Sequence, residues 1–273
     1  MAGAAQPVLR FENVTVAFEE EPVLTDLSFA AFEGESRVIL GAAGSGKTVL
    51  LKTALGLVKP VSGKVYVFGQ DITRMRERKL FDIRSKIGML FQESALFDSL
   101  TIEENVAYPL LNQKSIRLPL AQVHSRVLEA LEFVELGNTL EKFPSELSGG
   151  MRRRAAIARA VVTNPPLVLY DSPTAGLDPI TSYTIMALLV KARDVARTTN
   201  LVVTHRYQDG NMIANFRYNS EQGRVEPARN GAKGDVRTTF MVLQQGRLVF
   251  EGNQDQLEAE KDPYISKFVK QRE

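Results

Sequence analysis

The sequence predicts an α/β fold with a parallel sheet at its centre, and three observations carry this prediction. A glycine-rich loop, Gly41 to Thr48, joins a short run of branched apolar residues to a stretch with helical spacing. Further apolar runs alternate with helical stretches along the chain. Three of these runs lead into polar residues, at Gln92, Asp171 and His205. Because ligands bind at the carboxyl ends of parallel strands, we expect these three residues to meet at one edge of the sheet.

Composition limits the classes of protein to which this chain can belong. Its 273 residues are 44% hydrophobic, enough to bury a full core in one large domain or two small ones. The 34 basic and 32 acidic residues nearly balance, so charge does not indicate nucleic-acid binding. The absence of cysteine excludes disulfides and thiolate metal sites. The sequence shows neither a signal-peptide pattern nor an apolar run of about 20 residues, so we expect a soluble chain that relies on another protein for membrane contact.

The N-terminal half predicts strands around the glycine loop. Strands are expected over 8–18, 23–32, 36–40, 63–69 and 87–91, and a helix over 47–57. From about residue 98 to 163 the strand pattern gives way to helical spacing, with helices expected over 102–111, 120–136 and 149–162. This segment predicts a helical subdomain placed between strands of the core.

The C-terminal part returns to alternating strands and helices. The expected elements are a strand over 167–170, a helix over 179–196, a strand over 201–204, a hairpin over 239–251 and a closing helix over about 254–269. The polar segment 215–237 contains glycine and lacks periodicity, which predicts a flexible surface insertion. Together the elements predict a single domain over residues 6–270.

The glycine loop matches G-x-x-x-x-G-K-[ST], a phosphate-binding pattern. Gly44 and Gly46 let the backbone approach phosphate, and successive N–H groups at the helix start form an anion cradle. Lys47 is expected to reach the β- and γ-phosphates, and the Thr48 hydroxyl to bind Mg²⁺. Asp171, at the end of an apolar strand, is the acid expected to hold the same ion.

A second anion site is predicted at 147–151, which reads Leu-Ser-Gly-Gly-Met. Ser148, Gly149 and Gly150 stand at the start of a predicted helix, where free N–H groups and the positive end of the helix dipole favour an anion. One chain therefore carries two predicted phosphate sites.

With these motifs in this order, the sequence resembles the ATP-binding cassette family, the nucleotide-binding subunits of ABC transporters, from Val8 to about Phe268. The resemblance implies the ABC ATPase form of the phosphate-loop NTPase fold, with an antiparallel β part at the N-terminus. It also implies a head-to-tail pair of copies that sandwiches ATP between the phosphate loop of one copy and the 147–151 segment of the other. Because each surface is used once per nucleotide, this pairing explains why one chain has two anion sites.

The same resemblance assigns the residues of the site. Catalytic roles fall to Gln92, Ser172, Asp178 and His205, and magnesium to Thr48, Gln92 and Asp171. Contacts with ATP are implied for Phe18, Gly41, Ala42, Ala43, Gly44, Ser45, Gly46, Lys47, Thr48 and Val49, and for Ser148, Gly149, Gly150 and Met151. From the residues alone, Phe18 fits either the core or an adenine-stacking position. The resemblance favours stacking.

Within the family, the terminal methionine of Leu-Ser-Gly-Gly-Met and the runs Phe91 to Thr101 and Asn105 to Leu110 resemble the ATPases of Mla/Mce-type lipid transport. This resemblance implies integral membrane permease subunits and a lipid-binding protein of Mce/Mla type as partners, with the ATPase on the cytoplasmic face of the membrane. Leu96 and Phe97, in the loop after Gln92, are either a surface for the permease or residues of the local core.

One position departs from the family pattern. The family has Glu directly after the strand-terminal Asp, where it orients the attacking water, and this chain has Ser172. A serine hydroxyl can hold water but is a poor base at neutral pH, and losing a general base costs about 10²- to 10⁴-fold in rate. ATP and Mg²⁺ binding are expected to survive.

Three hypotheses therefore remain open at the level of sequence. The first is a transporter ATPase acting on a membrane partner. The second is a regulatory module that closes on ATP and turns over slowly or never. The third, a non-transport ABC ATPase, is weakened by the near-neutral charge and by the lack of a second cassette or a long coiled coil.

Overall fold

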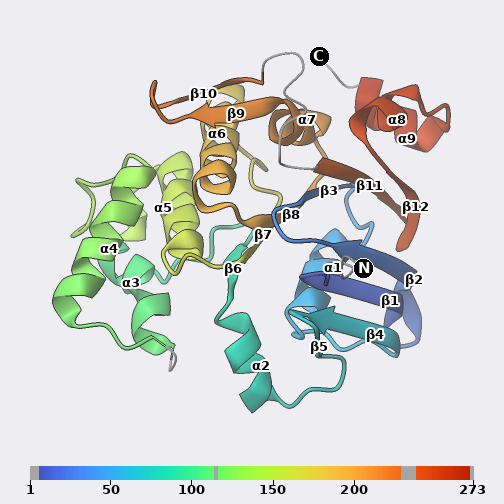
Figure 1. Cartoon of the computed structure of the whole chain (residues 1–273), viewed down its shortest axis with the longest axis horizontal. Helices are drawn as coiled ribbons and strands as arrows, with labels where there is room; N and C mark the ends of the chain where they lie inside the picture. Colours follow the sequence, from blue (N-terminus) through green and yellow to red (C-terminus); the bar gives the residue numbers. More distant parts are fainter. Residues whose placement is uncertain (1–5, 114–115, 229–237, 271–273) are drawn as a thin grey trace, which may run out of the picture.

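The computed structural model describes residues 6–113, 116–228 and 238–270. Its centre is a six-stranded sheet with the strand order β12-β11-β3-β8-β7-β6 (Figure 1). The strands are β3 (Ser36–Leu40), β6 (Ile87–Leu90), β7 (Leu167–Asp171), β8 (Thr199–Thr204), β11 (Thr238–Gln244) and β12 (Arg247–Gly252). Strands β11, β3, β8, β7 and β6 run parallel, and β12 pairs antiparallel with β11. The predicted parallel sheet is confirmed.

A second, antiparallel sheet lies beside the phosphate loop, with the order β2-β1-β4-β5. Its strands are β1 (Leu9–Phe18), β2 (Glu21–Ala31), β4 (Ser62–Val67) and β5 (Gln70–Asp71). The helix α1 (Lys47–Ala54) follows the loop and ends three residues earlier than predicted, and α2 (Glu77–Arg84) is a helix that the sequence pattern did not predict.

The helical subdomain lies on the other side of the central sheet (Figure 1). It contains the three predicted helices, α3 (Ile102–Asn112), α4 (Leu120–Phe133, three residues shorter than predicted) and α5 (Gly149–Val161), and a 3₁₀ turn (Pro144–Glu146) that was not predicted. Thr101 begins α3 with a reciprocal cap, in which its hydroxyl accepts from the Glu104 N–H and the Glu104 carboxylate accepts from the Thr101 N–H. This cap fixes the point at which the chain leaves the sheet for the helices.

Two hydrophobic cores result, one on each face of the sheet. Val38 and Leu40 of β3 point into the core shared with the helices, whereas Ile39 between them joins the core under the antiparallel sheet. The side chains of the other central strands divide in the same alternating way. All five β3 residues are buried, as is typical of a central parallel strand, and the polar residues Ser36 and Arg37 precede the apolar run from Val38 to Leu40.

The remaining elements correct two predictions. The segment 215–237 is not a featureless insertion: α7 (Tyr207–Asn215) ends within it, and β9 (Phe216–Asn219) and β10 (Arg224–Pro227) form a hairpin that packs on α6 (Pro179–Ala196). Residues 229–237 lie outside the described ones. Contacts with α6 stabilise this hairpin: the Asp194 carboxylate on α6 accepts from the Tyr218 N–H. Its own sequence has only a weak strand pattern.

The closing helix is two helices, α8 (Gln254–Ala259) and α9 (Pro263–Lys270). Pro263 lacks an N–H and disfavours helical backbone at Asp262, which explains the break. Asp262 then caps α9 by accepting from the N–H groups of Tyr264 and Ile265. No helix in the described part of the chain combines the length and apolar character needed to cross a bilayer.

Candidate functional site

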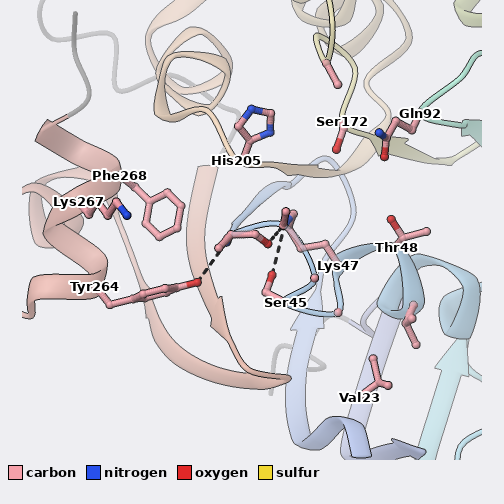
Figure 2. Close-up of a pocket in the computed structure, with 16 residues that line it drawn as sticks. Val23, Ser45, Lys47, Thr48, Gln92, Ser172, His205, Tyr264, Lys267 and Phe268 are labelled. Carbon is pink, nitrogen blue, oxygen red and sulfur yellow. Dashed lines mark hydrogen bonds between the residues drawn. The ribbon is translucent and has the colours of Figure 1, made fainter. Parts of the chain in front are cut away.

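The glycine loop runs from the end of β3 to the first turn of α1 (Figure 2). Gly46 has φ of 100°, and a Cβ there would lie 2.6 Å from the Leu24 side chain, so only glycine fits. Gly44 has φ of 76°, and a Cβ there would meet nothing within 4 Å. The loop backbone is therefore closed on its packed side and open where a ligand would approach.

The amino group of Lys47 folds back over this loop. It donates to the carbonyl oxygens of Gly41 and Ala42, both at 2.7 Å, and to the Ser45 hydroxyl at 3.3 Å (Figure 2). Burial lowers the pKa of Lys47, and the nearby Asp171 carboxylate acts against this shift. A phosphate oxygen is a stronger acceptor for this cation than a neutral carbonyl, so the arrangement favours exchange onto a bound anion.

A cavity of about 660 Å³ opens above the loop, within the range typical of small-molecule sites. It brings together the loop, Gln92 after β6, Ser172 after β7 and His205 after β8 (Figure 2). Of the three strand-end residues predicted to meet at this edge, Gln92 and His205 line the cavity. Asp171 is not among the lining residues, but the next residue, Ser172, is, and the Asp171 carboxylate accepts from Thr48, which also lines the cavity. The lining from the loop and α1 is Ala42, Ala43, Gly44, Ser45, Gly46, Lys47, Thr48 and Val49.

Oxygen ligands suited to Mg²⁺ gather at the same edge. The Thr48 hydroxyl donates to Asp171 Oδ2 at 2.8 Å, and the Asp171 carboxylate is almost fully buried. Gln92 adds an amide oxygen to the cavity wall. Hydroxyl, carboxylate and amide oxygens form the hard donor set that Mg²⁺ takes, so these residues fit the predicted metal.

Ser172 occupies a constrained position beside Asp171. Its φ is 48°, its N–H donates to the Val203 carbonyl at 2.8 Å, and its hydroxyl donates to Asp171 Oδ1 at 3.3 Å. Among the described residues that line the cavity there is no Asp or Glu, and His205 is the imidazole. The described lining therefore offers no carboxylate base toward water, and its imidazole belongs to His205.

Several implicated residues lie outside the cavity of their own chain. Ser148 caps α5 and accepts from the Met151 N–H at 3.2 Å, and Asp178 caps α6 and accepts from the Thr181 N–H at 3.0 Å. Neither the 147–151 segment nor Asp178 is among the lining residues. Phe18, at the end of β1, is 49% exposed and also absent from the lining, so its stacking role stays a prediction.

The sequence did not predict that α9 forms one wall of the cavity. Tyr264, Lys267 and Phe268 line it from the side opposite Gln92 and Ser172 (Figure 2). The Tyr264 hydroxyl accepts from the Ala42 N–H and donates to the Leu243 carbonyl, each at 3.1 Å. The spacing of the apolar residues in α9 indicates a buried face, but no local signal shows which distant surface that face covers.

A buried arginine connects the helical subdomain to this edge. Arg153 of α5 donates to the backbone carbonyls of Phe91, Gln92 and Ala175. It is 6% exposed, and burial lowers its pKa. The segment that follows β6 is therefore tied to the helix that carries the second predicted anion site.

Comparison with known proteins now decides the family. The family model described as ABC transporter matches residues 24–175, more than half of the chain. The chain belongs to this family. The matched region spans the phosphate loop, Gln92, the 147–151 segment and Asp171, and the sequence-based prediction of an ABC-type ATPase is confirmed.

Curated relatives include several transporter ATP-binding proteins. The intermembrane phospholipid transport system ATP-binding protein MlaF of Haemophilus influenzae is 32% identical over 265 residues, which cover 97% of this chain and 91% of that protein. The probable ribonucleotide transport ATP-binding protein mkl of Mycobacterium leprae is 36% identical over 72% of this chain and 56% of that protein. The methionine import ATP-binding protein MetN of Carboxydothermus hydrogenoformans is 42% identical over 66% of this chain and 52% of that protein. The chain spans about half the length of the last two.

Solved structures agree with this placement in the ABC family. A dimeric post-hydrolysis state of the ATP-binding cassette MJ0796, bound to ADP and Pi, has a TM-score of 0.75 and 31% identity, covering 90% of this chain and 98% of that one. The cbiO1 structure from Clostridium perfringens, part of the ABC transporter complex cbiONQ, has a TM-score of 0.76 and 26% identity, covering 97% and 95%. The predicted ABC ATPase fold is confirmed.

Proposed function

We propose that this chain is the ATP-hydrolysing subunit of a membrane lipid transporter and works as a head-to-tail pair around two Mg-ATP. One observation carries the proposal: the phosphate loop and the ends of β6, β7 and β8 form a single cavity, while the second predicted anion site of the chain, at 147–151, is not part of the described lining. A second copy, rotated by a two-fold axis, would supply that segment to the open side of the cavity.

The residues of the cavity divide the work on ATP. The N–H groups of the loop and the Lys47 amino group bind the phosphates, and negative charge developing on them would be stabilised by the same donors. Thr48, Gln92 and Asp171 would hold Mg²⁺, which when bound neutralises phosphate charge. His205 and Ser172 line the side where the water must approach, and they would orient it by hydrogen bonds.

A groove on the helical side suits the permease. It has a volume of about 240 Å³ and is lined by residues of β6, the following loop, α3 and α5. The rings of Phe97 and Tyr108 lie 4.8 Å apart at its edge, and each is 42% exposed. Arg159 donates to the carbonyls of Ser94 and Ala95 at 2.8 Å, which fixes the loop.

The two aromatic rings form the apolar surface that a helix of a membrane partner would cover. Leu96, by contrast, packs on the core, so of the two loop residues Phe97 is the one that supports a docking role.

Lipid as the transported substrate is the finer part of the proposal. It is supported by the similarity to MlaF along almost the full length of both chains, whereas the mkl and MetN relatives carry other substrates in their names. On this proposal an Mce/Mla-type lipid-binding protein joins the permease, and the chain sits at the cytoplasmic face of the membrane.

Ser172 favours a second candidate, a module that closes on ATP but turns over slowly. The lack of a described carboxylate in the cavity lining supports it. Both candidates bind ATP and dimerise, and they differ in the rate of hydrolysis within the assembled complex.

The test is purification of the tagged chain from its native membrane, with lipids extracted from the purified complex and turnover measured in it. The proposal requires an integral permease, bound phospholipid and ATP hydrolysis that depends on Lys47. A complex that carries no lipid removes lipid as the substrate. Complete lack of turnover in the intact complex favours the slow module.

A further inference from the structure

A buried carboxylate joins the two strand ends that carry Ser172 and His205. Asp209, in the first turn of α7, is 2% exposed. A single oxygen, Oδ2, accepts from the hydroxyl of Thr174 at 2.8 Å and from that of Thr204 at 2.6 Å. Thr174 stands two residues after Ser172, and Thr204 directly precedes His205. Both threonines are 1% exposed, so water does not compete for these bonds.

Further hydrogen bonds extend this link toward the α6 cap. The Thr204 hydroxyl also accepts from the Arg206 N–H at 3.1 Å. The Arg206 guanidinium donates to the Ser182 hydroxyl at 2.8 Å, and that hydroxyl donates to the Leu177 carbonyl at 3.4 Å. Both neighbours of His205 in the chain are therefore tied to the segment between β7 and α6.

The His205 ring itself extends from this fixed frame into the cavity (Figure 2). Its side chain is exposed, and its position relative to Ser172 depends on how β8 and the segment after β7 are held together. The backbone contributes one bond near this point, from the Ser172 N–H to the Val203 carbonyl. Asp209 adds a side-chain connection between the same two segments, at Thr174 and Thr204, which follow Ser172 and Val203 in the chain.

We propose that Asp209 is a positioning residue for ATP hydrolysis, which fixes His205 relative to Ser172 through the hydroxyls of Thr204 and Thr174. Its two described side-chain hydrogen bonds go to Thr174 and Thr204 and not to the phosphate loop. Asp209 therefore acts on the side of the cavity that holds Ser172 and His205. The inference rests on the proposed ATPase function. Because a displacement of about 1 Å in a catalytic group can cost on the order of 10²-fold in rate, loss of this frame should slow hydrolysis without weakening ATP binding.

Burial raises the pKa of Asp209, while the two hydroxyl bonds and the charges of Arg206 and His205 act in the opposite direction. Asp209 holds the two threonines by accepting hydrogen bonds rather than by its negative charge, since both bonds end on the single oxygen Oδ2. Asparagine offers the same oxygen, so Asp209→Asn should keep the frame and Asp209→Ala should lose it.

The experiment measures single-turnover hydrolysis and ATP affinity for five proteins: the parent, Asp209→Ala, Asp209→Asn, His205→Ala and the double variant Asp209→Ala/His205→Ala. We expect Asp209→Ala to slow hydrolysis at least about tenfold, with ATP affinity within about threefold of the parent, and Asp209→Asn to restore most of the rate. In the His205→Ala background, Asp209→Ala should cause no further loss, because residues that act through one another are not additive.

Thr139→Val is the matched control. It removes another buried hydroxyl, on a residue that is 1% exposed, which donates to the Leu136 carbonyl at 2.7 Å and is not part of the described cavity lining. It should lower the melting temperature without changing the rate. If Asp209→Ala does not fold, Thr204→Val takes its place in the same cycle.

Equal losses in both backgrounds, or an unchanged rate in Asp209→Ala, overturn the inference. A parent that binds ATP but never hydrolyses it in its assembled complex overturns the proposed ATPase function instead.

Discussion

Ser172→Glu tests the chemistry of this site most directly. The parent has a hydroxyl where the family has a carboxylate, and the described cavity lining offers no other Asp or Glu. A positioned general base contributes about 10²- to 10⁴-fold in rate, or roughly 2.7–5.5 kcal/mol at about 1.4 kcal/mol per tenfold. We expect the single-turnover rate to rise by at least about 10²-fold.

Repulsion from Asp171 explains why we expect a rate gain near the lower end of that range. Ser172 already has a Cβ at φ of 48°, so glutamate adds little backbone strain. Its carboxyl would extend two bonds beyond the serine hydroxyl, which lies 3.3 Å from Asp171 Oδ1. At a separation of about 6 Å, repulsion between the two carboxylates is roughly 0.7–3 kcal/mol for effective dielectric constants of about 80 to 20. This repulsion raises the pKa of the new carboxyl but leaves it ionised at pH 8. The rate of the variant should therefore rise with pH until the carboxyl is fully ionised, and then level off.

The assay follows release of labelled phosphate from ATP under single-turnover conditions at pH 8. Ser172→Gln is the control, because its amide can hold a water but cannot accept its proton. ATP affinity should change by less than about threefold, since the base acts in the transition state. If Ser172→Glu binds ATP normally and hydrolyses it no faster than the parent, the reasoning is refuted, and Ser172 with His205 already positions the water well enough.

Four further predictions follow from the site and its surroundings. Lys47→Ala should weaken ATP binding by roughly 10²-fold, because it removes charge-assisted bonds of about 1.5–3 kcal/mol; unchanged affinity by titration calorimetry would place the nucleotide elsewhere. Ser148→Arg should prevent ATP-dependent dimerisation in size-exclusion chromatography, while Ser148→Ala, which also loses the α5 cap, should still dimerise; dimers of both variants would contradict the sandwich. Phe97→Glu should release the permease in co-purification and spare ATP binding, whereas Leu120→Glu, also at an exposed position, should keep both the permease and ATP binding; loss of both functions in Phe97→Glu would indicate a folding role for Phe97. Tyr264→Phe removes two hydrogen bonds, which tie α9 to Ala42 of the loop and to Leu243 of β11, and should lower the free energy of unfolding by about 1–3 kcal/mol; an unchanged urea midpoint would show that α9 is held by other contacts.

The sequence predicted those parts of the molecule that depend on local pattern. The loop at 41–48 was predictable from its glycine and lysine pattern. The strands before it and at 167–171 were predictable because each is short, rich in apolar residues and bounded by glycine or a polar residue. The prediction that Gln92, Asp171 and His205 lie near one another followed from a general property of parallel sheets rather than from any one residue; Gln92 and His205 line the cavity together with Ser172, the neighbour of Asp171.

What the sequence missed depends on contacts between distant residues. The hairpin at 216–227 has weak strand spacing and owes its place to α6, so its pattern suggested an insertion. The α9 wall and the Asp209 link pair groups from distant elements, such as Tyr264 with Ala42 and Asp209 with Thr174. A single sequence contains no signal for such pairs, because burial and hydrogen bonding of this kind appear only once the chain is folded.

The strand order of the central sheet has a consequence for synthesis on the ribosome. Strand β3, which leads into the phosphate loop, lies between β8 and β11, and neither exists until residues 199–204 and then 238–244 have been made. Through most of translation this strand, which is fully buried in the folded protein, has no partner on either side, and unpaired apolar strands are prone to aggregation. The nascent chain therefore needs protection over 36–40 until about residue 244 has emerged, which makes synthesis of the middle of the chain the period of greatest risk for misfolding.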